Sequence, residues 1–444
     1  MTRLLTLLAF AFLSPLPSPA NELSAILLDG DLGEWTDADH VASDPVGDAI
    51  GAFDLSRVSA RVSGTQIFLR FDTQATLNLQ SGTEDDGTLR LLVEMPRNHE
   101  LAIDLRGRSA LLRTPEATLT IPWSDLKFAS LPTFAANDFE LRLDLKAFDL
   151  KAGDQVRLRF EGSDELAEPI ALSIGRQATQ SKKLQGLGAP AESVRIASLN
   201  TLKQGSASPE RAPLIKQMFE FADADIFCFN EELDEAKFRN SFQAVVPNEV
   251  ADTKNVHWSA TCAIVSRFPL TPLDFRCREA AALIELPSGK SIVVASVHFK
   301  CCGFTGSRED QRRIEEVNEL LSDLQRVRSG EFGEKAAAAG IVVLGDFNLV
   351  GSRKPLDLIN EAGLTDVMLT CPVDGSAMTW QGVSPRESFW PGRLDYVTLD
   401  LQRLKWTGGF VINSEQFRQV TLGPEIDTPA SDHSMLVVDV KPLL

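Results

Sequence analysis

The chain has 444 residues and a formal net charge of −18 at pH 7, with 62 acidic side chains against 44 lysines and arginines. This balance excludes a protein that holds nucleic acid by bulk positive charge, so a polyanionic substrate would need a local site or bound cations. The length is enough for about two or three domains with cores of their own.

The N-terminus has the layout of a secretory signal peptide. Arg3 gives a short positive start, residues 4–13 are almost wholly apolar, and the segment that ends at Ala20 is rich in proline and small residues. The apolar run is too short to span a bilayer as a helix. We therefore expect residues 1–20 to be cleaved, leaving a secreted or periplasmic protein without a transmembrane segment. An uncleaved anchor is the alternative.

Residues 21–175 show the pattern of an all-β domain. Apolar and charged residues alternate at 139–145 and at 156–160, which places the apolar side chains on one face. Such period-two runs between turn residues predict antiparallel strands packed as a β-sandwich. Residues 176–191 are polar, contain glycine and have no period, so we predict a linker that few contacts cross.

Residues 192–444 alternate between predicted strands and predicted helices. Ser307 and Asp310 form a variant capping box at the start of a helix, apolar residues follow at helical spacing, and Gly330 ends the helix. This alternation predicts a layered α/β domain. The predicted strands include 194–199, 225–229, 291–298 and 341–344.

Polar residues lie at the ends of six apolar strands in this second region, which is too regular an arrangement for a purely structural cause. Carboxylate, amide and imidazole groups would then meet in one cleft. The segments are Asn200, Asn230-Glu231, His298, Gly345-Asp346-Phe347-Asn348, Arg393-Leu394-Asp395-Tyr396 and Ser431-Asp432-His433.

These motifs, in this order, resemble the endonuclease/exonuclease/phosphatase family, which includes deoxyribonuclease I, abasic-site endonucleases, bacterial sphingomyelinases and inositol polyphosphate 5-phosphatases. Gly-Asp-Phe-Asn and Ser-Asp-His together carry the resemblance, which covers residues 192–444. It implies a four-layer α/β sandwich of deoxyribonuclease I type, with two packed mixed sheets. Asn230 stands where the family usually has glutamine, while Glu231 is kept.

The resemblance implies a metal site of oxygen ligands. Glu231 matches the principal metal ligand, and Asn200 and Asp432 lie where the family completes or supports the site. Oxygen ligands suit Mg²⁺ or Mn²⁺ and do not suit zinc.

The resemblance also implies roles for five further residues. His433 matches the catalytic imidazole, and Asp395 matches the carboxylate that orients it. Asp346 matches the residue that positions or deprotonates the attacking water, and Asn348 matches a donor to a phosphate oxygen. His298 matches a second histidine that donates to the phosphate or to the leaving oxygen. Which group takes the proton is left open.

The implied function is hydrolysis of a phosphodiester by in-line attack of water. The segment from Pro391 to Tyr396 resembles nucleases and general phosphodiesterases more than inositol phosphatases, so nucleic acid is one candidate substrate. A phospholipid such as sphingomyelin, or a small phosphate ester, is the alternative. A catalytically inactive surface-binding or glycan-binding protein is the alternative of another class. The oligomeric state stays open.

The first residues of the β domain resemble carbohydrate-binding family 9-like and DOMON-like β-sandwiches. The resemblance rests on Leu-Asp-Gly-Asp-Leu-Gly-Glu-Trp at 28–35, on Asp44-Pro-Val-Gly-Asp48 and on Asp54. It implies a glycan or cell-surface ligand, and a Ca²⁺ site made by Asp44, Asp48 and Asp54. Alternatively, these residues only form turns.

The six cysteines all lie in the second region. Cys301 and Cys302 are adjacent and would form a strained ring with each other. In an oxidising compartment we therefore expect one of them to pair with Cys262, Cys277 or Cys371, with six reduced thiols as the alternative. Trp380, Phe389 and Trp390 flank a loop, where they would form its core or else an exposed rim that stacks on a ligand. The loop core is our prediction.

Overall fold

The computed structural model of the chain describes residues 27–79, 87–105, 107, 109–175, 187–251, 254–381, 390–421 and 429–443. The expected signal peptide, most of the expected linker and Phe389 lie outside these residues. Among the helices described, none is both long enough and apolar enough to cross a membrane.

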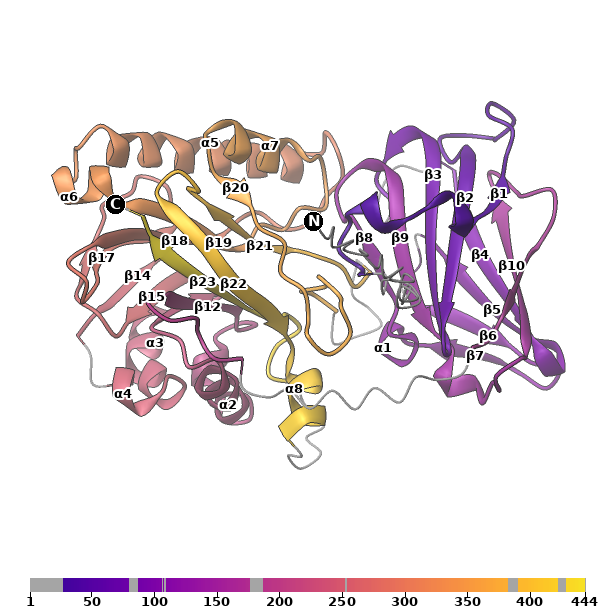
Figure 1. Cartoon of the computed structure of the whole chain (residues 1–444), viewed down its shortest axis with the longest axis horizontal. Helices are drawn as coiled ribbons and strands as arrows, with labels where there is room; N and C mark the ends of the chain where they lie inside the picture. Colours follow the sequence, from indigo (N-terminus) through magenta and orange to yellow (C-terminus); the bar gives the residue numbers. More distant parts are fainter. Residues whose placement is uncertain are drawn as a thin grey trace, which may run out of the picture.

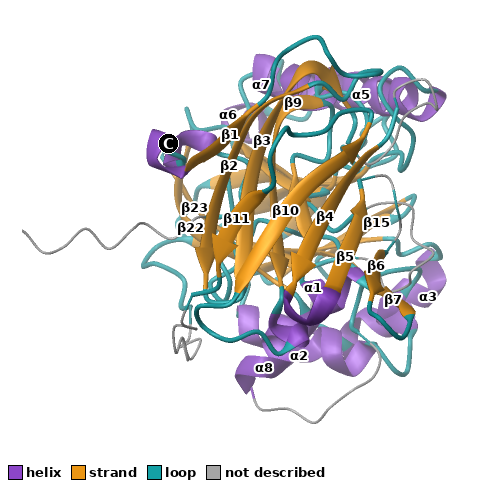
Figure 2. Cartoon of the chain, turned by 90° about the vertical axis from the view of Figure 1, so that its right-hand side faces the viewer, coloured by secondary structure: helices purple, strands orange, loops and turns teal. Residues whose placement is uncertain are grey.

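The N-terminal region consists largely of strands in two antiparallel sheets, as predicted. Figure 2 shows β10, β4 and β5 side by side in the half of the molecule nearest the viewer. The first sheet has the order β1 (His40–Ser43), β2 (Leu55–Ser63), β3 (Gln66–Leu77), β9 (Ala136–Asp144) and β8 (Ala129–Leu131). The second has the order β11 (Ile170–Ser173), β10 (Gln155–Gly162), β4 (Leu89–Met95), β5 (His99–Asp104), β6 (Ala110–Arg113) and β7 (Thr118–Ile121). Helix α1 (Trp123–Leu126) precedes β8.

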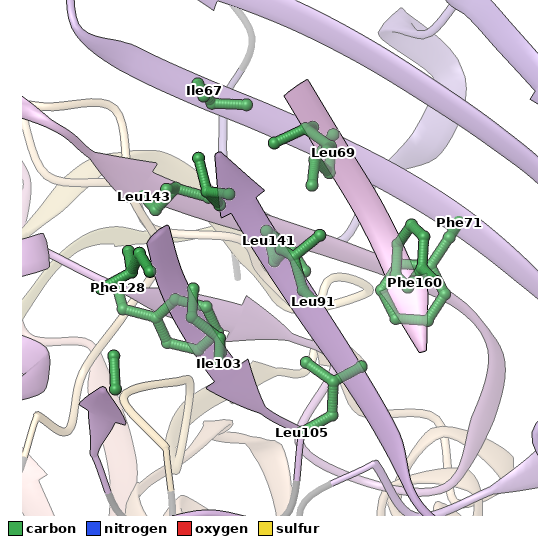
Figure 3. Packing of buried hydrophobic residues seen from close by; sticks show 14 of the residues in the cluster. Ile67, Leu69, Phe71, Leu91, Ile103, Leu105, Phe128, Leu141, Leu143 and Phe160 are labelled. Atoms are coloured by element: carbon green, nitrogen blue, oxygen red, sulfur yellow. The ribbon is translucent and has the colours of Figure 1, made fainter. Parts of the chain in front are cut away.

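The core of this sandwich follows from the alternation in the sequence. Leu69 of β3 pairs with Leu141 of β9, and the apolar side chains on either side of this pair point the same way. Leu91 and Phe160 from the second sheet meet them, and all of these side chains are buried (Figure 3). Burying one such side chain stabilises the fold by about 1.5–3 kcal/mol, which is why period-two patterning holds the two sheets together.

The C-terminal region holds two six-stranded mixed sheets. One has the order β14 (Val256–Ser259), β15 (Cys262–Ser266), β13 (Ile226–Asn230), β12 (Val194–Asn200), β23 (Met435–Pro442) and β22 (Leu404–Ile412). The other has the order β16 (Leu270–Pro272), β17 (Ala280–Glu285), β18 (Ser291–His298), β19 (Gly340–Asp346), β21 (Asp395–Leu399) and β20 (Thr365–Asp366).

Helices cover the outer face of each sheet, which makes four layers (Figure 1). Apolar residues of α5 and α7 pack on β18 and β19, and those of α2 and α3 pack on β12 and β13. A third apolar cluster fills the space between the two sheets. The four-layer α/β sandwich implied by the resemblance is therefore confirmed. The helices are α2 (Ala212–Ala222), α3 (Glu235–Ser241), α4 (Asn248–Ala251), α5 (Arg308–Arg328), α6 (Glu334–Ala338), α7 (Lys354–Glu361) and α8 (Ser414–Thr421).

Strand register places the polar strand ends beside one another. Strands β12 and β13 are parallel, so Asn200 lies opposite Asn230. Strands β18 and β19 are also parallel, so His298 lies opposite Asp346. Strand β21 runs antiparallel to β19 and begins at Asp395, opposite Asp346.

The two regions are in close contact, contrary to the expectation of few contacts. Trp390 is 1% exposed and belongs to the core of the N-terminal sandwich, where its ring meets Phe128 edge-on at 5.1 Å. Its indole N–H donates to the carbonyl of Gly107 at 3.2 Å. Trp390 thus lies in a core, as predicted, but mainly in the core of the other region.

Candidate active site

Asp346 lies at the centre of the cluster formed by the strand ends, and it is 1% exposed. Its Oδ2 accepts hydrogen bonds from the side-chain amides of Asn200 at 3.1 Å and Asn348 at 2.9 Å. Its Oδ1 accepts the backbone N–H of Asn348 at 2.9 Å. Burial raises the pKa of Asp346 well above its usual range, and the charges of Asp395 and Glu231 add to this shift.

His433 and Asp395 form a buried pair. Nδ1 of His433 lies 2.8 Å from Oδ2 of Asp395, and Nε2 lies 3.7 Å from Oδ2 of Asp346. Thr379 holds Asp395 in place, because its hydroxyl accepts the backbone N–H groups of both Leu394 and Asp395 at 2.9 Å. Burial alone would lower the pKa of His433, but Asp395 and Asp346 outweigh it and raise the pKa to about 10. The imidazole is therefore positively charged at neutral pH.

Glu231 lies on the open side of the cluster. Its Oε1 accepts the Asn200 amide at 3.2 Å, and its Oε2 accepts the backbone N–H of Lys203 at 2.8 Å. Burial raises the pKa of Glu231, but His298 and these two donors outweigh it, so the net shift is downward. The carboxylate is ionised, and 21% of its side chain is exposed to solvent.

His298 faces the same space from β18. Its Nε2 lies 3.7 Å from Oδ2 of Asp346 and 4.0 Å from Oε1 of Glu231, and its Nδ1 lies 3.3 Å from the hydroxyl of Thr261. Burial lowers the pKa of His298. The pKa shifts of the two imidazoles that flank Asp346 therefore have opposite directions, upward for His433 and downward for His298, and this separation lets one site both supply and accept a proton.

Two of the expected residues are oriented in a way the sequence could not indicate. Both amide hydrogens of Asn348 are used inside the protein, one by Asp346 and the other by the carbonyl of Phe299 at 3.1 Å. Donation to a phosphate would require one of these bonds to open. Asn200 faces the carboxylates with its nitrogen, while its Oδ1 accepts the Leu202 N–H at 3.0 Å. In this orientation Asn200 presents no oxygen to a cation in the cluster.

Asp432 directly precedes His433 in the chain and is 9% exposed. Its Oδ2 accepts the indole N–H of Trp380 at 3.3 Å, and its Oδ1 accepts the hydroxyl of Ser431, also at 3.3 Å. Ser431 in turn donates to the backbone carbonyl of Asn200 at 2.6 Å. These contacts tie the Ser-Asp-His segment to the end of β12.

The donor set fits a hard divalent cation. The carboxylates of Glu231 and Asp346 converge on the same Asn200 amide. Such oxygen-rich groups match Mg²⁺ or Mn²⁺. Since most of the lining is anionic, a cation there would also offset mutual repulsion.

Two buried carboxyl groups around the site have no counterpart among the residues predicted from the sequence. Glu232 is fully buried and accepts hydrogen bonds from Thr201 and Ser206, and burial raises its pKa. Glu279 accepts the backbone N–H of His298 at 2.9 Å, and burial raises its pKa to about 7. Neither lies in a recognisable motif. A charged residue next to an apolar strand was the only available signal.

The acidic residues of the N-terminal region are grouped differently from the expectation. Asp44, Asp48 and Asp164 offer oxygens within 4.8 Å of one another. Asp54 instead accepts the backbone N–H of Gly47 with both oxygens, at 3.1 and 2.9 Å. Burial and the neighbouring Asp164 raise the pKa of Asp44 to about 6. Oδ2 of Asp44 is buried and has no hydrogen-bond partner among the described residues.

The expected cysteine pairing is wrong for the structure. All six cysteines are among the described residues, and none is bonded to another. Cys262, Cys277 and Cys371 are buried, whereas Cys301 and Cys302 are partly exposed and lie next to each other, with their sulfurs 2.9 Å apart. The buried thiols fill space in the core, and loop geometry keeps the exposed pair together.

The model of the Endonuclease/Exonuclease/phosphatase family matches residues 197–433. Similar solved structures include TDP2 from D. rerio with a single-strand DNA product (14% identity, 56% of this chain and 99% of that one, TM-score 0.39). Others are the 3′–5′ exonuclease NExo from Neisseria meningitidis (18%, 56% and 100%, 0.38) and a beta toxin variant from Staphylococcus aureus with magnesium (17%, 56% and 99%, 0.36). No curated protein sequence matches the chain significantly.

Proposed function

Since the chain belongs to the endonuclease/exonuclease/phosphatase family, whose members hydrolyse phosphoester bonds, we propose that it is a secreted, metal-dependent phosphodiesterase. The observation that supports this most is the line of Asp395, His433 and Asp346, with contacts of 2.8 Å and 3.7 Å. A charged imidazole held by one carboxylate and aimed toward another can stabilise a phosphoryl oxygen or supply a proton.

Each residue around this line has a part in the proposed reaction. Asp346 orients the attacking water and accepts its proton, since a carboxyl group whose pKa is raised by burial is a stronger base than an exposed one. His433 donates to the phosphate, and His298, whose pKa is lowered by burial, shares the other side of the same space. A divalent cation held by Glu231 supplies charge neutralisation at the phosphoryl oxygens when bound.

The surroundings of His298 favour an extended polyanion such as nucleic acid. A hollow of about 260 Å³ adjoins His298 and is lined by Arg278, Lys300 and Arg312. Lys300 and Arg278 are exposed, and their charges could attract the phosphates that flank a scissile bond. Glu279, Glu316 and Glu319 line the same hollow, and Arg312 is paired with Glu316 and Glu319, so the charges of the hollow do not select nucleic acid alone. A small phosphate ester or a phospholipid such as sphingomyelin is the second candidate.

A substrate panel with the purified full-length protein tests this proposal. It would contain plasmid DNA, RNA, sphingomyelin, bis(p-nitrophenyl) phosphate and inositol phosphates, each with Mg²⁺ and then with excess EDTA. We expect hydrolysis that EDTA abolishes and Mg²⁺ or Mn²⁺ restores. Full activity in EDTA would refute the metal requirement. No hydrolysis of any substrate would favour an inactive binding protein.

The N-terminal acidic group supports a second proposal, a Ca²⁺ site formed by Asp44, Asp48 and Asp164. The observation behind it is the buried and unpartnered Oδ2 of Asp44 between two other carboxylates, an arrangement that a hard cation would relieve. Ca²⁺ should raise the melting temperature of the full-length protein, and Asp164→Asn should remove that effect. Asp37→Asn, at an exposed residue paired with Arg57, is the matched control. The glycan or cell-surface ligand implied for this region stays a prediction.

A further inference from the structure

Cys301 and Cys302 form a pair of thiols in the loop that leaves β18. Their sulfurs lie 2.9 Å apart, and both side chains are partly exposed. Cys301 also lines the hollow that adjoins His298. The four other cysteines are buried, so this pair is the part of the cysteine set that a dissolved reagent can reach.

The loop backbone is held in the conformation that brings the two sulfurs together. Cys302 has φ +74°, in the left-handed region that a non-glycine residue rarely takes. The guanidinium of Arg313 is fully buried and donates to the carbonyls of Lys300 and Cys302, at 3.3 Å for its Nη2 contact with Cys302. Backbone restraint of this kind keeps adjacent thiols together even though chain geometry disfavours their ring.

Nearby charges make Cys301 the more reactive sulfur. Nζ of Lys300 lies 3.8 Å from its Sγ. The hydrogen bond from Cys302, together with Lys300 and Arg313, lowers the pKa of Cys301 to about 6 against the effect of burial. The thiolate is the nucleophile in thiol–disulfide exchange, so Cys301 is the sulfur that would attack first.

We propose that Cys301 and Cys302 form a reversible two-electron oxidation site, in which a low-molecular-weight disulfide converts the pair into a vicinal disulfide. The thiolate of Cys301 attacks one sulfur of the small disulfide, forms a mixed disulfide and releases one thiolate. Cys302 then loses its proton to solvent, attacks Sγ of Cys301 and releases the second thiolate. The pair loses two electrons and two protons, and the small disulfide becomes two thiols.

The ring would be easily reduced again. Adjacent Cα atoms lie about 3.8 Å apart, below the usual range for a disulfide, so the bond is strained. Strained and exposed disulfides are the labile ones, in contrast to the stable disulfides that staple secreted domains. The proposal therefore predicts that Cys301 and Cys302, in the wall of the hollow beside His298, are oxidised or reduced according to the ratio of disulfide to thiol in the surrounding solution.

Mass spectrometry on the full-length protein tests the proposal directly. Trypsin cleaves after Lys300 and Arg308, so the peptide 301–308 contains Cys301 and Cys302 and no other cysteine. The protein is equilibrated with oxidised and reduced glutathione at several ratios, quenched in acid, alkylated and digested. With rising oxidised glutathione, the peptide should lose both alkylation sites and two hydrogens, and dithiothreitol should restore them. In the reduced protein, phenylarsine oxide should block both alkylations together.

Single substitutions distinguish the vicinal disulfide from other modifications of the two thiols. In Cys302→Ser, Cys301 should stop at a stable mixed disulfide with glutathione, because the second attack is impossible. Cys277→Ser should behave as the wild type, although Cys277 lines the same hollow. Complete alkylation of both thiols at every glutathione ratio would overturn the proposal. A cross-link between Cys301 and Cys277 would overturn it too, and both results can be read from the wild type alone.

Discussion

The N-terminal and C-terminal regions differ in the residues that they contribute to the candidate active site, but side chains of each region pack into a hydrophobic core of the other. The C-terminal region carries every residue of the candidate active site, whereas the N-terminal region is a sandwich with no catalytic group assigned to it. Yet Trp390 is buried in the N-terminal core, and Phe134 of the N-terminal region packs against the apolar cluster under α5 and α7. The boundary that the sequence predicts between the two regions therefore does not separate their hydrophobic cores.

Hydrogen bonds also connect the N-terminal region to the segments that carry the candidate active site. The hydroxyl of Thr133 lies 2.7 Å from the carbonyl of Leu349 and 2.9 Å from that of Arg393. The amide of Asn78 donates to the carbonyls of Val350 and Gly351 at 3.0 Å. These carbonyls belong to the two segments that carry Asn348 and Asp395. The comparison suggests that one region performs the chemistry and the other holds its loops.

The strongest test of this division of roles is to remove the proposed catalytic side chains, all of which lie in the C-terminal region. His433→Ala and Asp346→Ala should each lower kcat at least about 100-fold, the usual scale for losing an acid–base group. Both side chains are buried and hydrogen-bonded, so circular dichroism must show that each variant is folded before the rates are compared. His40→Ala, at an exposed histidine of the N-terminal region, is the control and should leave the rate unchanged. A nearly normal rate in either site variant would show that the active site lies elsewhere.

The shared core can be broken at Trp390. Trp390→Ala removes a side chain that is 1% exposed and packs on Phe128 and Trp123, so the free energy of unfolding should fall by about 3–5 kcal/mol. Thermal or urea unfolding measures this loss. Trp406→Ala, at a tryptophan that is 40% exposed, is the matched control and should cost far less. Equal losses in the two variants would contradict a shared core.

Thr133 tests whether the sandwich positions the site. Thr133→Val keeps the shape but leaves buried carbonyls without their donor, at a cost of about 1–3 kcal/mol. We expect a lower kcat with little change in KM, because the segments of Asn348 and Asp395 shift while the substrate surface remains. Thr133→Ser should restore most of the rate. If Val and Ser variants lose stability alone, with kcat unchanged, Thr133 has only a structural role.

The last test concerns the pH dependence of stability and lies in the N-terminal region. Glu140 is 1% exposed and accepts hydrogen bonds from the indole of Trp35 and the backbone of Gly30, yet burial raises its pKa to about 7. The folded state therefore holds this proton more tightly than the unfolded state does. The stability that Glu140 contributes through this proton is fully present below about pH 4.5. Above that, this stabilising free energy falls by at most about 1.4 kcal/mol per pH unit until about pH 7. In Glu140→Gln, the decline of the melting temperature between pH 5 and pH 8 should be shallower. An identical decline in both proteins would exclude Glu140 as its source.

Patterning and motifs predicted most of the fold but not the contacts between regions. Alternation at 139–145 identified β9, and the strand ends identified Asp346 and His433, because both signals are local in the chain. The contact of Thr133 with Leu349 and Arg393 joins residues more than 200 positions apart, and no local pattern encodes it. Asp164 follows β10 of the second sheet and Asp44 follows β1 of the first, so no local pattern in the sequence links the two.

The backbone at Glu231 has a consequence for anyone who engineers this protein. Glu231 has φ +61° and Asn348 has φ +50°, in the left-handed region, where most side chains cost about 1–2 kcal/mol, asparagine costs less and glycine costs little. A screen for heat resistance alone would therefore tend to select glycine at these two positions. Each such gain would remove a carboxylate or an amide that the proposed reaction uses. Selection for thermal tolerance and for turnover must run together, because at these positions the two demands oppose each other.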